Sequence, residues 1–212
     1  GYRDIEGQKG VPCDLVVINT CTVTQDADRT NRYWVRRLHR EHPEAKIAVT
    51  GCYVEKNRAE IEALPEVGLI FRNHEKGRLL EFLQDSPVDG RIHAESPFSY
   101  TPLTVSRSEG KTRAYVKIQD GCNHACSFCK VSVVRGDSRS RQLSEILAEV
   151  ERLRDAGYRE IILTGIQLGA YGMDLAPVAG SGERHYFLRD VIESCAKVDA
   201  IDRIRLSSIE LT

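Results

Sequence analysis

Long apolar runs are missing from this chain of 212 residues. No hydrophobic stretch exceeds about five residues, whereas a membrane-spanning helix needs roughly 20. An excess of one charge is missing too: 30 Lys and Arg stand against 31 Asp and Glu, so the whole chain is no general polyanion binder. No charged and then apolar leader follows Gly1, and we therefore expect a cytoplasmic location without a membrane partner. The balance of 41% hydrophobic and 29% charged residues excludes disorder, collagen and a coiled-coil rod.

Cysteine, in contrast, is abundant. The chain has seven cysteines: Cys13, Cys21, Cys52, Cys122, Cys126, Cys129 and Cys195. An odd number cannot pair completely, which disfavours a disulfide framework. Three of them form a C-x3-C-x2-C loop, GCNHACSFC, that also contains His124. A structural zinc site needs four ligands, whereas an iron–sulfur cluster held by three thiolates keeps one iron open. The loop is therefore a candidate cluster site, with an incomplete zinc knuckle as the alternative.

Strand and helix patterns alternate along residues 1–85. Short β-branched apolar runs are separated by segments with helical periodicity. Strands are expected at Asp14–Thr20, Lys46–Thr50 and Val67–Phe71, and helices at Gln25–Glu41, Lys56–Leu64 and Glu75–Gln84. This order predicts an α/β domain with a parallel sheet.

Periodicity is lost over residues 86–110, where Pro, Ser, Thr and Gly gather, and we predict a linker there. A second β/α series follows over residues 111–212. Its strands are expected at Ala114–Gln119, Glu160–Thr164 and Arg203–Ser208, and its helices at Leu143–Ala156 and Phe187–Lys197. Because so few β/α units cannot close a barrel, we expect a fragment that ends in a partial barrel. The cysteine loop follows the first of these strands, where α/β folds place their sites.

The helix expected over Gln25–Glu41 has two faces. Stepping about 100° per residue gathers Trp34, Val35 and Leu38 on an apolar side. Four arginines lie opposite: Arg29, Arg32, Arg36 and Arg40. We expect Trp34 to pack on the sheet and the arginines to be solvated, with a phosphate contact as the alternative. Residues 111–141 carry a net charge of +5, and this basic rim suits an RNA substrate or is simply a charged barrel surface.

Two further cysteines end consecutive strands. Cys21 follows the first strand in INTCTVT, and Cys52 follows the second in VTGC. Parallel strands joined by a right-handed crossover end at the same sheet edge, so these cysteines should be neighbours. Cys13 precedes the first strand, roughly 25 Å from Cys21 at about 3.3 Å per residue, and is expected to be a spare thiol. Cys195, in the last helix, is expected in the core.

The segment VKIQDGCNHACSFCKVSVVRG, Val116–Gly136, resembles the cluster loop of radical S-adenosylmethionine (SAM) enzymes, and more narrowly of methylthiotransferases. The cysteine spacing, Phe128 before the third cysteine and the SRSR run that follows carry the resemblance. It implies that Cys122, Cys126 and Cys129 hold a 4Fe–4S cluster. The open iron would bind SAM, and an electron would cleave SAM to a 5′-deoxyadenosyl radical.

Three more segments are similar to the enzymes of this family that act on N6-threonylcarbamoyladenosine in tRNA: Asn19–Asp28, Leu163–Gly172 and Arg203–Glu210. The resemblance implies a second 4Fe–4S cluster, held in part by Cys21 and Cys52, with its third ligand upstream of this chain. It also implies a SAM site, whose candidate residues are Phe128, Thr164, Gly165, Ser207 and Glu210.

The implied activity is methylthiolation of C2 of the modified adenosine next to the anticodon, with tRNA as substrate and an external electron donor. Isopentenyladenosine in tRNA and a ribosomal protein are alternative substrates, and a non-catalytic zinc-binding RNA module is the alternative of another class. Lys130 and Ser132 stand where the family usually has an apolar residue and a proline, and we expect Lys130 to face solvent. Because the upstream cysteine and the rest of the radical domain are absent, we expect the isolated chain to be inactive.

Overall fold

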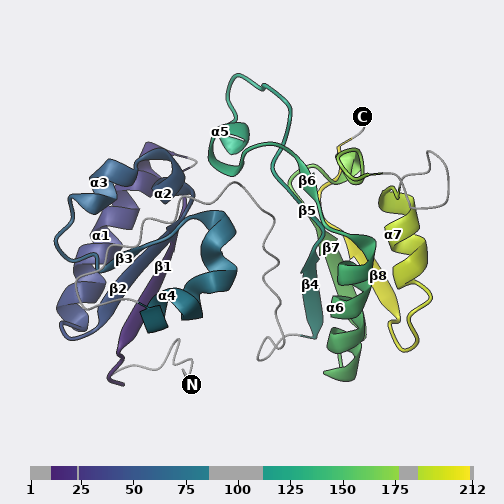
Figure 1. Cartoon of the computed structure of the whole chain (residues 1–212), viewed down its shortest axis with the longest axis horizontal. Helices are drawn as coiled ribbons and strands as arrows, with labels where there is room; N and C mark the ends of the chain where they lie inside the picture. Colours follow the sequence, from purple (N-terminus) through teal and green to yellow (C-terminus); the bar gives the residue numbers. More distant parts are fainter. Residues whose placement is uncertain (1–10, 23, 86–111, 177–185, 211–212) are drawn as a thin grey trace. The chain divides into compact units, whose positions relative to one another are not determined.

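The computed structural model describes residues 11–22, 24–85, 112–176 and 186–210 (Figure 1). The chain divides into two compact units, Gly1–Thr101 and Pro102–Thr212. The predicted linker, 86–110, lies outside the described residues, so the domain boundaries stay a prediction. Among the described residues, no helix is both long and apolar enough to cross a membrane.

The first unit is a three-stranded parallel sheet in the order β1-β2-β3. Its strands are β1 (Leu15–Thr20), β2 (Lys46–Gly51) and β3 (Leu69–Ile70). Its helices are α1 (Gln25–Glu41), α2 (Cys52–Lys56), α3 (Arg58–Glu62), the 3-10 helix η1 (Asn73–Arg78) and α4 (Leu79–Asp85). This is the α/β order that the sequence predicts.

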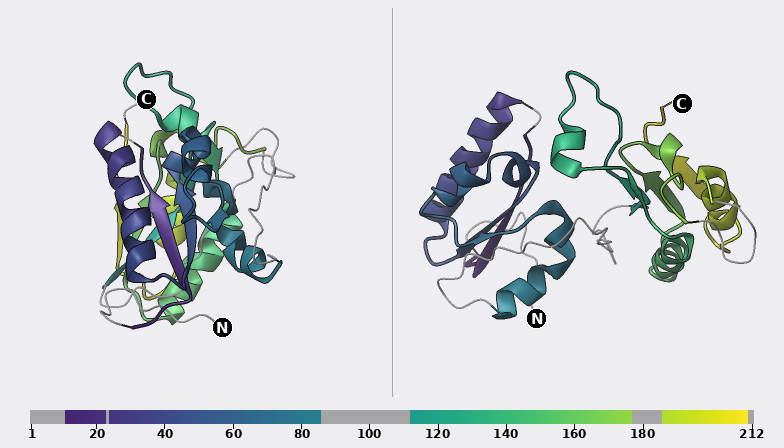
Figure 2. Two further views of the ribbon diagram at one scale, coloured as in Figure 1. Left: turned by 90° about the vertical axis from the view of Figure 1, so that its left-hand side faces the viewer. Right: turned by 45° about the horizontal axis from the view of Figure 1, so that its top comes forward.

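Helices cover both faces of that sheet, as Figure 2 shows for α1 on one side. Ile47 and Val49 of β2 pack with Val35 of α1 in one core cluster. Ala48, between them, points to the other face, where it packs with Phe82 of α4. Alternate residues of a strand face opposite sides, so a strand covered on both sides is apolar throughout. This explains the continuous apolar run of β2.

Two predictions for α1 and α2 need correction. Trp34 is 40% exposed instead of packed on the sheet, because Asp28 and Val35 are the buried residues of α1. The helix expected over Lys56–Leu64 is present but shorter, as α3, and the sequence did not predict α2 before it. The chain enters α2 directly at Cys52, since Gly51 has φ +107° and turns it out of the strand, and α3 starts after Asn57.

The second unit holds a parallel sheet in the order β4-β7-β8. Its strands are β4 (Arg113–Lys117), β7 (Glu160–Thr164) and β8 (Arg203–Leu206). The helices α6 (Leu143–Asp155) and α7 (Leu188–Cys195) pack on one face of it, over a core that includes Val116, Leu163 and Cys195 (Figure 1). The prediction that Cys195 lies in the core is confirmed.

Short elements that the sequence did not predict frame the cysteine loop. The strand expected over Ala114–Gln119 breaks after Lys117. Its end forms β5 (Gln119–Asp120), which pairs antiparallel with β6 (Arg139–Ser140). The helix α5 (Val131–Arg135) lies between β5 and β6 in sequence, and the 3-10 helix η2 (Leu168–Ala170) follows β7. The two-stranded ribbon is the base from which the cysteine loop rises.

Candidate functional site

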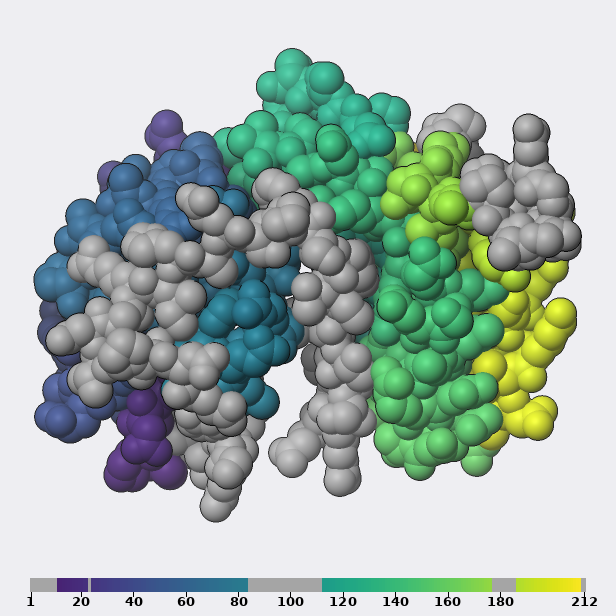
Figure 3. Space-filling view, viewed as in Figure 1, coloured from purple at the N-terminus to yellow at the C-terminus, as the bar shows by residue number. Residues whose placement is uncertain are grey.

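The cysteine loop joins β5 to β6, beyond the carboxyl end of β4. Figure 3 shows it standing clear of the rest of its own unit. The two ends of the loop meet where Cys122 N–H donates to the Gly136 carbonyl at 3.1 Å. Gly121 has φ +74°, and a Cβ there would collide with the Asp137 carbonyl, so the turn requires glycine.

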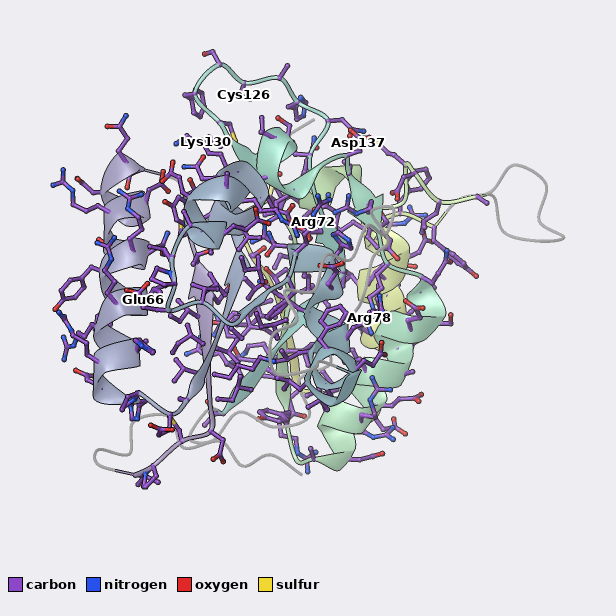
Figure 4. The ribbon with its side chains drawn as sticks, turned by 60° about the vertical axis from the view of Figure 1, so that its left-hand side comes forward. Glu66, Arg72, Arg78, Cys126, Lys130 and Asp137 are labelled. Atoms are coloured by element: carbon purple, nitrogen blue, oxygen red, sulfur yellow. The ribbon has the colours of Figure 1, made fainter. Side chains whose placement is uncertain are left out.

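The three loop thiols differ in exposure. Cys126 is exposed, near the outer bend of the loop in Figure 4, while Cys122 and Cys129 are half-buried. Backbone N–H groups approach two of the sulfurs, His124 N to Cys122 Sγ at 3.4 Å and Val131 N to Cys129 Sγ at 3.5 Å. Hydrogen bonds to the cysteine sulfurs are among the features that tune iron–sulfur clusters.

Across the described residues, no three Cys, His, Asp or Glu side chains are gathered as the ligands of one metal ion. The structure therefore brings the three cysteines onto one loop without converging their thiols. The donor set nevertheless fits a three-thiolate iron–sulfur cluster: three cysteines on an accessible loop, with N–H groups directed at two sulfurs.

A buried glutamine ties this loop to the end of β7. The Gln119 side chain is fully buried, and its Oε1 accepts N–H bonds from Ile166 and Gln167, both at 2.8 Å. Its Nε2 donates to the Gly121 carbonyl at 2.8 Å and to Ser138 Oγ at 2.9 Å. One side chain thus fixes both ends of the cysteine loop against the segment after β7.

Gln167 in turn contacts Cys122, a candidate cluster ligand: the Cys122 thiol donates to Gln167 Oε1 at 3.3 Å. The side chain is 5% exposed and lies beside a groove of about 440 Å³. The groove is lined by Asn123, His124, Ser138, Gln167, Ala170, Met173 and Asp174. Neither glutamine was singled out by the sequence, since their roles depend on contacts between residues 45 to 48 positions apart.

The segment after β7 also packs on the base of the loop. Tyr171 OH donates to the Arg141 carbonyl at 2.6 Å, and burial raises the pKa of this phenol well above its usual value. Gly172 N donates to Ser140 Oγ at 2.8 Å, and the nearby Asp174 accepts from Ser140 N, also at 2.8 Å. The segment Leu163–Gly172, which resembles the family, therefore holds β6 in place.

Charges at the loop base are mostly neutralised within the unit. Asp120 is buried, which alone would raise its pKa, but Lys117 and Arg135 outweigh the burial and hold the pKa below its usual value. The Lys117 ammonium lies 2.6 Å from this carboxylate. Arg141 is 3% exposed and paired with the buried Glu149. Three residues of the predicted basic rim, Lys117, Arg135 and Arg141, are thus engaged in internal ion pairs.

The candidate SAM residues lie at or near the carboxyl ends of the strands. Thr164 ends β7, and Ser207 follows β8, with its N–H bonded to the Leu163 carbonyl at 3.0 Å and its Oγ buried without a described partner. A Cβ on Gly165 would lie 2.9 Å from Gln119 Oε1, so this glycine is also needed for packing. Phe128 is 89% exposed on the loop, and Glu210 is exposed beyond β8.

Lys130 and Ser132, the two departures from the family pattern, flank the start of α5. Both are half-buried, so Lys130 does not simply project into solvent as predicted. Figure 4 shows Lys130 below Cys126 on the side of the loop that leads into α5.

Cys21 and Cys52 follow paired residues of the first sheet. Thr20 and Gly51 are partners in the parallel register of β1 and β2, and the two cysteines come next along each strand. Cys21 is exposed and Cys52 half-buried, with Asn73 Nδ2 3.9 Å from Cys52 Sγ. Cys13 precedes β1, at the opposite end of the strand from Cys21, as predicted. Asn73 is a neighbour of the site that the sequence did not indicate.

Two family models match the chain. The Uncharacterized protein family UPF0004 covers residues 1–71, and the Radical SAM superfamily covers residues 116–206.

Curated relatives match along nearly the whole chain. Threonylcarbamoyladenosine tRNA methylthiotransferase MtaB of Bacillus subtilis is 38% identical over 93% of this chain and 43% of its own length. The protein of the same name from Chlamydia pneumoniae is 37% identical over 99% of this chain and 45% of its own. A tRNA-2-methylthio-N(6)-dimethylallyladenosine synthase of Streptomyces avermitilis is 34% identical over 98% of this chain and 41% of its own. The chain thus spans a little under half the length of these relatives. With its UPF0004 domain followed by a radical SAM domain, it belongs to the radical SAM methylthiotransferase family.

Proposed function

We propose that this chain supplies the UPF0004 domain and the start of the radical SAM domain of a tRNA methylthiotransferase. The observation that carries the proposal is the cysteine loop at the carboxyl end of β4, fixed to the next strand of the sheet by Gln119. A zinc knuckle would need no such connection to a parallel β/α unit.

In this proposal Cys122, Cys126 and Cys129 hold a 4Fe–4S cluster, which the radical SAM family implies together with SAM. When bound, the cluster supplies the electron that cleaves SAM. The residues of this chain hold the thiolates and leave one coordination position open. Gln167 lies against one of the thiols, and Thr164, Gly165 and Ser207 line the strand ends where SAM would be oriented.

Cys21 and Cys52 are proposed to contribute to a second cluster in the UPF0004 domain. Supporting this, the register of β1 and β2 places both cysteines at one sheet edge. Asn73 would then stand beside a cluster ligand, held by the Glu55 carboxylate, which accepts from Asn73 N at 2.9 Å.

The substrate we propose is N6-threonylcarbamoyladenosine in tRNA. Two relatives named for this nucleoside are 38% and 37% identical to the chain, against 34% for one named for dimethylallyladenosine. These identities differ little, so the dimethylallyl (isopentenyl) form is the second candidate. An electron donor from outside the chain and a cytoplasmic location complete the proposal.

Anaerobic reconstitution with iron and sulfide tests the metal centre. We expect 4Fe–4S absorption and spin resonance signals that are lost on replacing Cys122, Cys126 and Cys129 with alanine but remain in the Cys195→Ala control. About one zinc per chain and no iron would overturn the proposal. Nucleoside mass spectrometry of tRNA from cells that lack the gene tests the substrate. Loss of methylthio from isopentenyladenosine alone would reverse our choice.

A further inference from the structure

The helix α1 carries a row of arginines along one side. Its residues 29–40 include five arginines and no Asp or Glu. Four of the arginines, together with Tyr33, line a groove of about 440 Å³ on this helix: Arg29, Arg32, Arg36 and Arg40. Figure 4 shows nitrogen-tipped side chains projecting from the side of α1 that faces away from its sheet.

Of the four arginines that line the groove, Arg32 alone makes a side-chain hydrogen bond within the described part of the chain. Arg32 donates to Glu60 at 2.9 Å and also bonds the Tyr53 hydroxyl. Arg29, Arg36 and Arg40 are exposed and form no hydrogen bond or ion pair with the described part of the chain. Glu41, next to Arg40, is instead bonded to Arg37 at 2.8 Å.

Such a row opposes helix stability, because like charges four residues apart repel each other. An exposed helix face that is merely solvated usually mixes both signs. The exposed face of α6 does so, with Glu145, Glu151 and Asp155 beside Arg152 and Arg154. The fold does not need the three unpaired guanidinium groups of α1, so they are best explained by an anionic ligand.

Aromatic rings are interleaved with the row. Tyr33 and Trp34 are 51% and 40% exposed, and their rings contact edge to face with centroids 5.7 Å apart. The Arg37 guanidinium stacks over the Trp34 ring at 4.9 Å and so holds it in place. Planar guanidinium forks suit phosphate oxygens, and exposed rings stack on unpaired bases. A row from Arg29 to Arg40 extends about 16 Å along the helix, long enough for several phosphates.

We propose that this face of α1 is an RNA-binding surface, on which Arg29, Arg36 and Arg40 contact backbone phosphates and Tyr33 stacks a base. The identification of the polyanion as RNA rests on the proposed function. The charge pattern and the groove are observations of the structure and do not depend on that function.

The test is the salt dependence of RNA binding by the full chain, measured by fluorescence anisotropy. The probe is a labelled anticodon stem-loop RNA with an unmodified adenosine next to the anticodon. Each phosphate contact adds about 0.7 to 0.9 to the slope of log affinity against log salt. The triple variant Arg29→Gln, Arg36→Gln, Arg40→Gln should therefore lower the slope by about 2 to 3. Between 50 and 200 mM salt, wild-type affinity should fall roughly 20- to 40-fold more than that of the variant.

The matched control removes the same net charge from exposed positions of the other unit, through Arg152→Gln, Arg189→Gln and Lys197→Gln. It should keep the wild-type slope. If both triple variants lower the slope equally, only net charge matters and the proposal is overturned. Single variants, each expected to lower the slope by about 1, keep the test decisive if the triple variant unfolds.

Two other outcomes would also overturn the proposal. One is an unchanged slope in the α1 variant. The other is loss of poly-glutamate binding with RNA binding intact, which would indicate an acidic protein partner. Neither outcome affects the iron–sulfur reconstitution, so failure of this surface and failure of the proposed function are distinguishable.

Discussion

Replacing Gln119 with leucine tests the connection between the cysteine loop and β7. The side chain is fully buried, and leucine has nearly the same size without the polar atoms. The N–H groups of Ile166 and Gln167 would each lose an acceptor at 2.8 Å. Leaving a buried donor unpaired costs about 1 to 3 kcal/mol, so the two together cost about 4 kcal/mol. The more favourable burial of leucine offsets about 1 kcal/mol, which leaves a net loss of about 3 kcal/mol.

Urea unfolding can assign this loss of stability to the second of the two compact units. The chain has one tryptophan, Trp34, and it lies in α1 of the first unit. Its fluorescence therefore reports on the first unit, while far-UV circular dichroism reports on both. With a slope of about 2 kcal/mol per molar urea, the dichroism transition of the second unit should move down by about 1.5 M. The fluorescence midpoint should not move.

Gln142→Leu is the matched control, because Gln142 is exposed and its side chain makes no capping bond to α6. It should change stability by less than about 0.5 kcal/mol. A Gln119→Leu loss below about 1 kcal/mol would contradict a stabilising role for the Gln119 network, since the network would then contribute no more than an exposed glutamine. An equal shift of the fluorescence midpoint would refute it as well. If the network also supports the loop, the variant should retain less iron after reconstitution.

Three further predictions concern stability and thiol reactivity. Glu149→Gln leaves the guanidinium of Arg141, which is 3% exposed, without its buried carboxylate and should cost about 3 kcal/mol in urea unfolding. Gly51→Ala should cost about 2 kcal/mol by Trp34 fluorescence, because φ is +107° and the new Cβ would collide with the Thr20 carbonyl. Burial raises the pKa of Cys195 to about 11, so at pH 8 its native alkylation by iodoacetamide should be at least about 100-fold slower than that of an exposed thiol. Because this pKa is raised on folding, the same thiol should lower stability as pH rises from about 9 to 11.

Each of these has a matched control in the chain. Glu151→Gln changes an exposed charge on the same helix as Glu149 and should have little effect. Gly157 also has a positive φ, +92°, but a Cβ there would lie within 4 Å of no other atom. The expected smaller cost of Gly157→Ala therefore measures the free energy of backbone strain without a collision. Cys126 is the exposed reference thiol. Equal effects in a variant and its control, or equal alkylation rates at Cys195 and Cys126, would contradict the corresponding explanation.

Where periodicity was strong, the sequence predicted elements closely. The bounds of α1 and β7 agree with expectation, because both have a clear period and a clear end. The buried face of α1 was misjudged. A helical wheel weights hydrophobicity, yet Asp28 is buried beside Lys56 at 3.9 Å while Trp34 is half exposed. The packing of α1 against both β2 and α2 decides which side of the helix is covered.

The loop with three cysteines, and the two strand ends with Cys21 and Cys52, could be predicted from the sequence alone. These features are local, set by cysteine spacing and by strands whose apolar runs can be read directly. Which side chains support these features depends on the folded arrangement of the strands. Gln119 and Gln167 reach partners 45 to 48 residues away, and Asn73 reaches Cys52 from 21 residues away. Such contacts depend on how neighbouring strands are aligned, and a buried polar side chain gives no periodic signal before that alignment is known.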